Sequence, residues 1–341
     1  MPGSVRSGAR LRRVRTRRFG DTDLEASEIG FGTWALGSSW WGDVSEAAGE
    51  RLLKQALDLG ITFFDTGDAY GRGANEELVG RVLGPRRDDV VIATKFGYEL
   101  GSGRRDHSEG ERPQRWDAAF VRQQLEASLS RLGTDRVDLY QLHNPRMDAV
   151  ASDETFEALE ALRAEGKLRH YGVALGPAIG WREEGLRAIS EREITAVQTV
   201  YNLLEQDPGR DLMDAAAEHG VGVMARVPTS SGLLDDNLTP DTTFGEGDHR
   251  RHRPQEWLVE GLQKIERIRF LCGPDSGRTM PQAALRFILD SGITTVIPTI
   301  TSSAELREYA SASDVPELRA DELAKVGELY ERNFGVEPVS A

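Results

Sequence analysis

The sequence predicts an α/β protein in which eight parallel strands close into a (β/α)8, or TIM, barrel. Eight short apolar, β-branched runs alternate with amphipathic helical segments along the 341 residues, as expected for parallel strands covered on both faces. A hydrophobic content of 39% is enough for a large core. An open doubly wound sheet is the alternative fold. It would need a G-x-G-x-x-G loop after the first strand, where residues 30–34 read Gly-Phe-Gly-Thr-Trp.

The predicted strands are separated by segments that carry helix signals. They span residues 29–33, 61–64, 90–93, 137–140, 171–174, 196–200, 221–224 and 294–297. Ser45 and Thr279 can each cap a helix, and Pro208 suits the first turn of another. Glycines follow these helices and favour their termination, at Gly60, Gly220 and Gly292.

Three stretches interrupt this alternation. Residues 15–28 are expected to form a β-hairpin that plugs the barrel floor. Residues 98–116 and 228–256 form long polar loops after strands 3 and 7, and loops of this length in a compact domain are usually functional. We therefore expect a basic, disordered leader over residues 1–14 and a single barrel domain over residues 15–341.

Charge and composition exclude several classes of protein. The chain has 42 basic and 56 acidic side chains, so its net charge of −14 disfavours general nucleic-acid binding. No run approaches the roughly 18 apolar residues of a membrane span, and the single Cys272 excludes a disulfide framework. The arginine-rich leader has no apolar region, so it is not a secretory signal, and we expect a cytoplasmic protein. The leader is either solvated or contacts an acidic partner, nucleic acid or a membrane.

Four reactive side chains are expected at one end of the barrel. Asp65 ends the second strand and Tyr70 follows it, while Lys95 ends the third strand and His143 the fourth. Because a barrel builds its active site at the C-terminal ends of its strands, these side chains should converge.

This set of residues can transfer a proton. A phenol with a pKa of about 10 is a weak acid, but a lysine ammonium close to its oxygen favours the phenolate. Tyr70 can therefore donate a proton, Asp65 can balance the charge of Lys95, and His143 can polarise a carbonyl. The set lacks a nucleophile with an adjacent base, which favours protonation of a carbonyl oxygen over acyl transfer or glycoside hydrolysis.

The motifs around these residues resemble those of the aldo-keto reductases. The resemblance extends from about Val14 to Phe334. It rests on GFGTW at 30–34, FDTGDAYG at 64–71, TKFG at 94–97, RLGTDRVDLYQLH at 131–143, on Gln198 and Tyr201-Asn202, and on SGLL at 231–234.

The resemblance implies reduction of a small aldehyde, ketone or sugar with NADPH, or alternatively with NADH. Tyr70 would be the general acid, tuned by Lys95 and Asp65, with His143 orienting the carbonyl. Trp34 would form a wall of the substrate site. The resemblance assigns the cofactor to Thr33, Trp34, Asp65, Gln198, Tyr201, Arg226, Val227, Pro228, Thr229, Gly232, Thr299, Thr301, Glu305 and Tyr309. Among these, Gln198 would hold the carboxamide and Tyr201 would stack on the nicotinamide.

Several positions depart from the family pattern. Ala174-Leu175 replaces the usual Ser-Asn that holds the carboxamide, and Arg226 stands in the place of a tyrosine, where it could approach a phosphate or the ribose. Glu305 would repel a 2′-phosphate if it pointed inward, and Tyr309 replaces an asparagine.

Two alternatives and the choice of substrate remain open at this point. A family member could bind the cofactor but act as a sensor or regulatory subunit with little turnover. A metal-dependent barrel hydrolase would need clustered ligands, and His143 has no such partners in the sequence. Basic residues at Arg104, Arg105, Arg112 and 248–253 suit an anionic or sugar-like substrate, or are simply solvated. We expect no metal, nucleic-acid or membrane partner, and the oligomeric state is left open.

Overall fold

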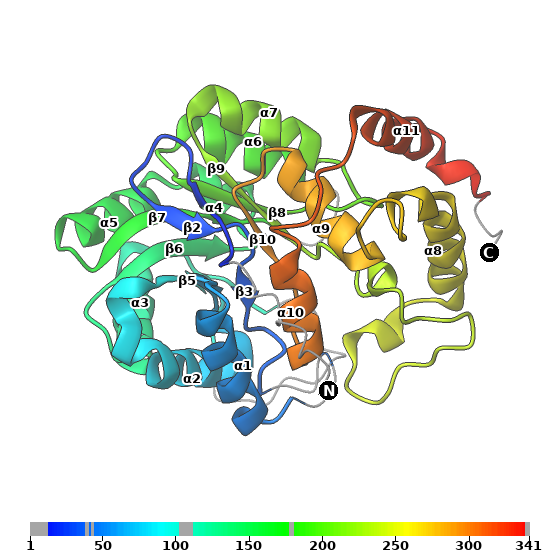
Figure 1. Ribbon diagram of the computed structural model, residues 1–341. Coiled ribbons are helices and arrows are strands. Elements are labelled where there is room, and N and C mark those ends of the chain that lie inside the picture. The colour runs from blue at the N-terminus through cyan, green and yellow to red at the C-terminus, as the bar shows by residue number, and fades with distance from the viewer. Residues whose placement is uncertain (1–12, 38–40, 42–43, 102–111, 177–180, 338–341) are drawn as a thin grey trace, which may run out of the picture.

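The protein forms the predicted barrel in a computed structural model (Figure 1). The structure describes residues 13–37, 41, 44–101, 112–176 and 181–337. Almost all of the predicted leader lies outside these residues, as do Arg104 and Arg105. Within the described ranges, no helix is both long and apolar enough to cross a membrane.

Eight parallel strands form the barrel wall in the order β3 to β10. Their bounds are β3 Phe31–Gly32, β4 Phe63–Asp65, β5 Val91–Phe96, β6 Val137–His143, β7 Leu168–Ala174, β8 Ala196–Val200, β9 Gly222–Arg226 and β10 Thr295–Ile297. The wall closes between the first strand and the last, where the Gly30 amide donates to the Val296 carbonyl and the Val296 amide to the Glu28 carbonyl, each at 2.8 Å. The predicted closed sheet is therefore confirmed.

Helices surround this wall and connect its strands (Figure 1). They are α1 Glu46–Asp58, α2 Ala74–Leu83, α3 Ala118–Leu132, α4 Met147–Ala151, α5 Asp153–Ala164, α6 Arg182–Glu191, α7 Gly209–His219, α8 Gln255–Arg267, α9 Met280–Asp290, α10 Ser303–Ser311 and α11 Ala320–Glu331. The predicted caps are present: the Ser45 hydroxyl accepts from the Ala48 amide, and Thr279 forms a capping box with Gln282. Pro208 is the N-cap of α7 rather than a residue of its first turn.

The N-terminal hairpin also lies where the sequence predicts it. Its antiparallel strands are β1 Thr16–Arg18 and β2 Glu25–Ser27. The buried side chains of Phe19, Leu24 and Ala26 pack inside the barrel. They form one apolar cluster with Phe63, Val91, Ala93, Leu139, Ala196, Met224 and Ile297. The hairpin thus closes the end of the barrel opposite the C-terminal ends of the strands.

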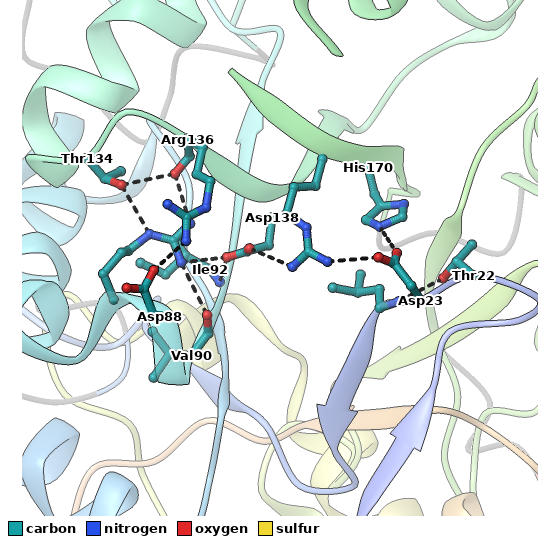
Figure 2. A network of polar contacts seen from close by, with 12 residues as sticks. Thr22, Asp23, Asp88, Val90, Ile92, Thr134, Arg136, Asp138 and His170 are labelled. Carbon is teal, nitrogen blue, oxygen red and sulfur yellow. Dashed lines mark hydrogen bonds and ion pairs between the residues drawn. The ribbon is translucent and has the colours of Figure 1, made fainter. Parts of the chain in front are cut away.

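A network of charged side chains fastens the hairpin to the wall (Figure 2). Asp138 on β6 accepts from the Ile92 amide at 2.9 Å and pairs with Arg87 at 2.8 Å and with Arg169 at 3.4 Å. Asp23, in the hairpin turn, accepts from Arg169 at 3.2 Å and contacts His170 at 3.0 Å. Arg169 therefore joins the buried carboxylate of the wall to the exposed carboxylate of the hairpin.

Candidate active site

The parity of each strand decides which side chains enter the barrel. Side chains alternate across a strand, so residues two apart share a face. The inner apolar cluster contains Phe63, Ala93, Leu139, Ala196 and Met224. Two residues further along the same strands come Asp65, Lys95, Gln141, Gln198 and Arg226. A polar layer consequently lies on top of the apolar floor, at the mouth of the barrel.

Lys95 and Asp65 form the centre of this layer. The fully buried Lys95 Nζ lies 2.6 Å from Asp65 Oδ2 and donates to the Thr66 carbonyl at 2.7 Å. Asp65 Oδ1 accepts from Gln141 Nε2 at 3.2 Å and from Gln198 Nε2 at 3.1 Å. Burial lowers the pKa of Lys95, but the charges of Asp65 and Tyr70 outweigh it and leave the pKa above its ordinary value. Lys95 is thus a fixed cation.

Tyr70 lies directly over this cation. It opens the 3₁₀ turn Tyr70–Gly73 after β4, and its partly exposed ring has its centroid 4.8 Å from Lys95 Nζ. Gly71 and Gly73 take positive φ values of 56° and 95° in this turn, a conformation that favours glycine. The phenol is therefore held between a buried ammonium and the open mouth.

His143 completes the predicted set at the end of β6. Its ring meets the Tyr70 ring edge-on at 5.8 Å and the Tyr98 ring at 5.0 Å. Burial, reinforced by the charges of Lys95 and Arg226, holds the pKa of His143 well below its ordinary value. The imidazole is consequently neutral and has one N–H to offer a carbonyl oxygen. All four predicted catalytic residues converge.

Two mouth residues were not predicted from the sequence. Gln141 donates to Asp65 from β6, which lies two strands away from β4. The signal that could have found it was the parity of β6, which puts Gln141 on the same face as Leu139 and His143. Tyr98, at the start of the loop after β5, accepts from Asn144 Nδ2 at 2.7 Å and packs against His143. The sequence marked only the loop that contains Tyr98 as functional.

Of the predicted cofactor residues, Gln198 lies at the mouth, whereas Tyr201 points away from it. Gln198 is buried in the polar layer, bonded to Asp65 and to Gln141. Tyr201 has the opposite parity on the same chain segment and faces the helices: it is 3% exposed, stacks on Phe287 at 5.5 Å and contacts Ser291. These contacts give no support to a stacking role for Tyr201. Ala174 and Leu175 are buried and add no side-chain donor.

The first loop is fixed to the rest of the mouth at two points. The Thr33 amide and hydroxyl both donate to the Asp65 carbonyl, at 3.0 and 3.1 Å. Trp34 lies edge-on to His249, which belongs to the loop after β9, at 5.0 Å. Trp41 stacks on the same histidine at 4.8 Å. The loops after β3 and β9 thus meet in an aromatic cluster at the rim.

The turn after β9 has an unusual backbone. Val227, Ser230, Ser231 and Gly232 all take positive φ values, of 55°, 49°, 57° and 91°. The Leu234 amide donates back to the Thr229 carbonyl, which folds the segment from Pro228 into a compact turn. Consecutive backbone N–H groups in such turns form concave sites for anions. This is the segment expected to lie against a pyrophosphate.

The loop after β10 lies beside this turn. Tyr309 donates to Asp235 Oδ1 at 2.8 Å, and Thr229 donates to the other oxygen of Asp235 at 3.2 Å. Glu305 turns back to the start of its own helix, where one carboxylate oxygen accepts from the Thr301 amide and hydroxyl, each at 2.8 Å, and from the Ser302 amide. The Glu305 carboxylate therefore lies at the N-terminus of α10, where it caps the helix.

The mouth contains polar atoms that the protein itself does not satisfy. Among the described residues, His143 Nδ1, Asn144 Oδ1 and Arg226 Nε are buried without a hydrogen-bond partner. Such atoms in a native fold call for an explanation, and a bound polar ligand is one. The described residues contain no group of three His, Cys, Asp or Glu side chains placed to hold a metal ion.

Fold and mouth together define a (β/α)8 barrel whose mouth brings a tyrosine, a lysine, an aspartate and a histidine together. The family model "Aldo/keto reductase family" matches residues 28–331, and the chain therefore belongs to this family. The aldo-keto reductase YhdN of Bacillus subtilis is 33% identical over 281 residues, which cover 79% of this chain and 80% of YhdN. The aldo-keto reductase yakc [NADP(+)] of Schizosaccharomyces pombe is 31% identical over 287 residues, 82% of this chain and 80% of that protein.

Solved structures agree with this assignment. The holo form of aldo-keto reductase AKR11C1 from Bacillus halodurans has a TM-score of 0.75 at 28% identity, covering 94% of this chain and 100% of that one. The glycerol dehydrogenase AKR11B4 from Gluconobacter oxydans has a TM-score of 0.77 at 26% identity, covering 96% of this chain and 98% of that one. The predicted family and fold are confirmed.

Proposed function

We propose that this protein is an NAD(P)H-dependent oxidoreductase that reduces the carbonyl of a small aldehyde, ketone or sugar to an alcohol. Aldo-keto reductases act on carbonyls with nicotinamide cofactors, so the family supports the reaction class. The observation that carries the proposal is the position of Tyr70, over the buried Lys95–Asp65 pair and against the neutral His143.

Each residue of the mouth has a part in the proposed reaction. The cofactor, when bound, supplies a hydride. The neutral His143 donates a hydrogen bond to the carbonyl oxygen and holds it within reach of the Tyr70 hydroxyl. Tyr70 gives its proton to that oxygen as negative charge develops there. Lys95 stabilises the phenolate that remains, and Asp65 keeps Lys95 in place.

Two glutamines hold the Lys95–Asp65 pair in position. Gln141 and Gln198 each donate to the Asp65 oxygen that does not face Lys95. Asp65 is therefore held by Lys95, Gln141 and Gln198. Moving the Lys95 ammonium to another acceptor would break its ion pair with Asp65 and disturb these hydrogen bonds. Such preorganisation lowers the cost of charge rearrangement during reaction.

Binding of the cofactor is proposed along the edge of the mouth formed by β8, β9 and β10. Gln198, the turn from Val227 to Gly232 and the loop from Thr299 to Tyr309 would hold its nicotinamide, pyrophosphate and adenosine ends, respectively. NADP(+) stands in the name of the S. pombe relative, which supports NADPH. The Glu305 carboxylate at the N-terminus of α10 opposes a 2′-phosphate there, so we expect NADH to be accepted as well.

Replacement of the general acid tests this proposal. Tyr70→Phe should lower kcat/KM for an aromatic aldehyde about 10²- to 10⁴-fold, because it removes only the proton donor. Its affinity for NADPH and NADH, followed by quenching of tryptophan fluorescence, should stay within about 2-fold of the parent protein. Tyr171→Phe is the matched control, since it removes a phenolic hydroxyl that bonds Glu160 outside the barrel.

Two results would contradict the proposal. Turnover by Tyr70→Phe at the level of the control would show that another group supplies the proton. Tight cofactor binding by the parent protein without turnover of any aldehyde, ketone or sugar would instead indicate the regulatory family member. We further propose a cytoplasmic location for the protein.

A further inference from the structure

The helix that follows Tyr70 begins with two buried polar side chains. Tyr70 opens the turn that ends at Gly73, and α2 starts at the next residue. In the first turn of α2, Asn75 is 2% exposed and Glu76 is 0% exposed. Burying an amide beside a carboxylate is costly unless both are hydrogen-bonded. The partners of these two side chains therefore show which segments the start of α2 holds together.

Asn75 connects the start of α2 to the segment around Asp65. Asn75 Nδ2 donates to the Thr33 carbonyl at 2.7 Å. The Thr33 amide and hydroxyl both donate to the Asp65 carbonyl, at 3.0 and 3.1 Å. Asn75 Oδ1 lies close to the Tyr70 turn, 3.6 Å from the position that a Cβ on Gly71 would take. A short chain of hydrogen bonds thus runs from α2 through the first loop to the end of β4.

Glu76 connects the start of α2 to the strand that carries Lys95. Glu76 Oε1 accepts from the Thr94 hydroxyl at 2.5 Å, and Oε2 accepts from Arg131 Nε on α3 at 2.6 Å. Thr94 comes directly before Lys95 on β5, so its side chain lies on the opposite face of the strand, toward the helices. Glu76 therefore fixes α2 to the outer face of β5 at the point where the inner face carries Lys95.

Arg131 extends this network to the Tyr70 turn itself. Gly73, the last residue of the turn, has a φ of 95°. A Cβ on Gly73 would lie 2.5 Å from Arg131 Cδ and 2.8 Å from Arg131 Nε, so only glycine leaves room for the arginine side chain. The turn is consequently packed against α3 as well as being joined to α2. We call the side chains of Asn75, Glu76, Thr94 and Arg131 the α2 anchor.

We propose that the α2 anchor is a set of positioning residues that holds the Tyr70 phenol over the Lys95 ammonium. This inference rests on the proposed function, in which Tyr70 is the proton donor. The centroid of the Tyr70 ring lies 4.8 Å from Lys95 Nζ, although the two residues come from a turn and a separate strand. The attraction between the ammonium and the charge that develops on the phenol oxygen falls with distance, and a misplacement of about 1 Å can cost about 10²-fold in rate. Glu76 is the central member, because it bonds to one side chain beside Lys95 and to one beside the Tyr70 turn.

Removal of the Glu76 charge tests this role. Glu76→Gln keeps an oxygen that can accept from Thr94 but loses the ion pair with Arg131. With saturating NADPH and an aromatic aldehyde, kcat should fall about 10- to 100-fold, because the phenol is no longer held in place. KM for the aldehyde and the dissociation constant for NADPH should stay within about 3-fold of the parent values, because Glu76 lies outside the barrel wall.

A milder pair of substitutions tests the same role without removing a charge. Thr94→Val keeps the shape of threonine but leaves Glu76 Oε1 without its donor, and Thr94→Ser keeps the hydroxyl. We expect kcat to fall about 3- to 10-fold in Thr94→Val, to stay close to the parent value in Thr94→Ser, and KM to be unchanged in both. These variants decide the question if Glu76→Gln does not fold. A kcat that is equal in Thr94→Val and the parent protein would overturn the inference.

Glu322→Gln is the matched control. Glu322 also lies in the first turn of a helix, α11, is 1% exposed and pairs with Arg278 at 2.6 Å. Its replacement should lower the free energy of unfolding about as much as Glu76→Gln does, but should leave kcat unchanged. In a double-mutant cycle, Glu76→Gln should have little further effect on the residual turnover of Tyr70→Phe, because no proton donor remains to be positioned. Equal relative losses in the two backgrounds, or an equal loss of kcat in Glu322→Gln, would make Glu76 a merely structural residue.

An NMR measurement keeps the inference independent of turnover. In protein labelled with ¹³C at tyrosine Cζ, the signal of Tyr70 is the one that is missing from Tyr70→Phe. Its chemical shift should change in Thr94→Val and be the parent value in Thr94→Ser and Glu322→Gln. An unchanged Tyr70 signal in Thr94→Val would overturn the inference even if carbonyls are reduced. A changed signal in a protein that turns over no carbonyl would support the positioning of Tyr70 and contradict the proposed reaction.

Discussion

Replacement of one buried carboxyl should make the protein more stable. Asp68 lies two residues before Tyr70, is fully buried, and has no hydrogen-bond partner for either carboxyl oxygen within the described structure. Burial, and next the charge of Glu76, raises the pKa of Asp68 from 3.8 to about 8. At neutral pH the folded protein must therefore hold Asp68 largely protonated, whereas the unfolded chain would release the proton.

The size of this cost follows from the shift. One pKa unit corresponds to about 1.4 kcal/mol, and pH 7 lies about 3 units above the unfolded pKa, which gives about 4 kcal/mol. Because the folded state binds more protons than the unfolded state between about pH 4 and pH 8, the free energy of unfolding falls as pH rises through this range. Asparagine has the shape of the protonated acid but cannot ionise. Asp68→Asn should therefore remove this pH dependence.

Urea unfolding at pH 5, 6, 7 and 8 measures the effect. Asp68→Asn should exceed the parent protein by about 1 kcal/mol at pH 5 and by about 2–4 kcal/mol at pH 7, at an unchanged m-value. Asp241→Asn is the matched control, because Asp241 is exposed and should give a difference near zero at every pH. A stability difference for Asp68→Asn that is the same at pH 5 and pH 8 would refute the assignment of a protonated Asp68.

Two further substitutions test the network that fastens the hairpin to the barrel wall and the proposed binding site for the adenosine end of the cofactor. Asp138→Ala leaves Arg87, Arg169 and the Ile92 amide without their shared acceptor. Urea unfolding should therefore show that the free energy of unfolding falls by about 3–5 kcal/mol. A fall below about 1 kcal/mol would mean that the network contributes little to stability. Glu305→Gln keeps an oxygen for the cap of α10 but removes its charge. In fluorescence titrations, the ratio of NADPH affinity to NADH affinity should be several-fold higher in Glu305→Gln than in the parent protein, which corresponds to about 1 kcal/mol. An unchanged ratio would mean that the 2′-phosphate binds elsewhere.

The fold could be predicted from sequence because its signals are local. Each barrel strand is a short apolar run, and the helices between them have recognisable caps such as Ser45 and Thr279. The hairpin is predicted as a stretch that does not fit the alternation, and its inward residues Phe19 and Leu24 explain why it closes the floor. The network around Asp138 could not be predicted, because its partners come from separate loops that the sequence does not place relative to one another.

The convergence of Asp65, Tyr70, Lys95 and His143 could be predicted because all four residues lie at or just after strand ends. Family resemblance was less reliable for side-chain direction. It assigned a stacking role to Tyr201, three residues after Gln198. An odd separation along an extended chain puts two side chains on opposite faces, and Tyr201 indeed faces Phe287 and the helix layer. Strand parity therefore conflicts with the family assignment at this position, and the observed contacts of Tyr201 follow parity.

The same parity makes the mouth a costly part of the fold. On β5 and β9, it continues the apolar floor of Ala93 and Met224 into Lys95 and Arg226, so two cations stand where hydrophobic side chains would pack at lower cost. Lys95 is paired with Asp65 inside the protein, and we propose that it supports the proton donor Tyr70. Arg226 has its Nε buried without a hydrogen-bond partner among the described residues, so shielding this cation costs free energy that a partner would offset. A ligand that supplied such a partner would therefore stabilise the folded protein by the free energy of its binding.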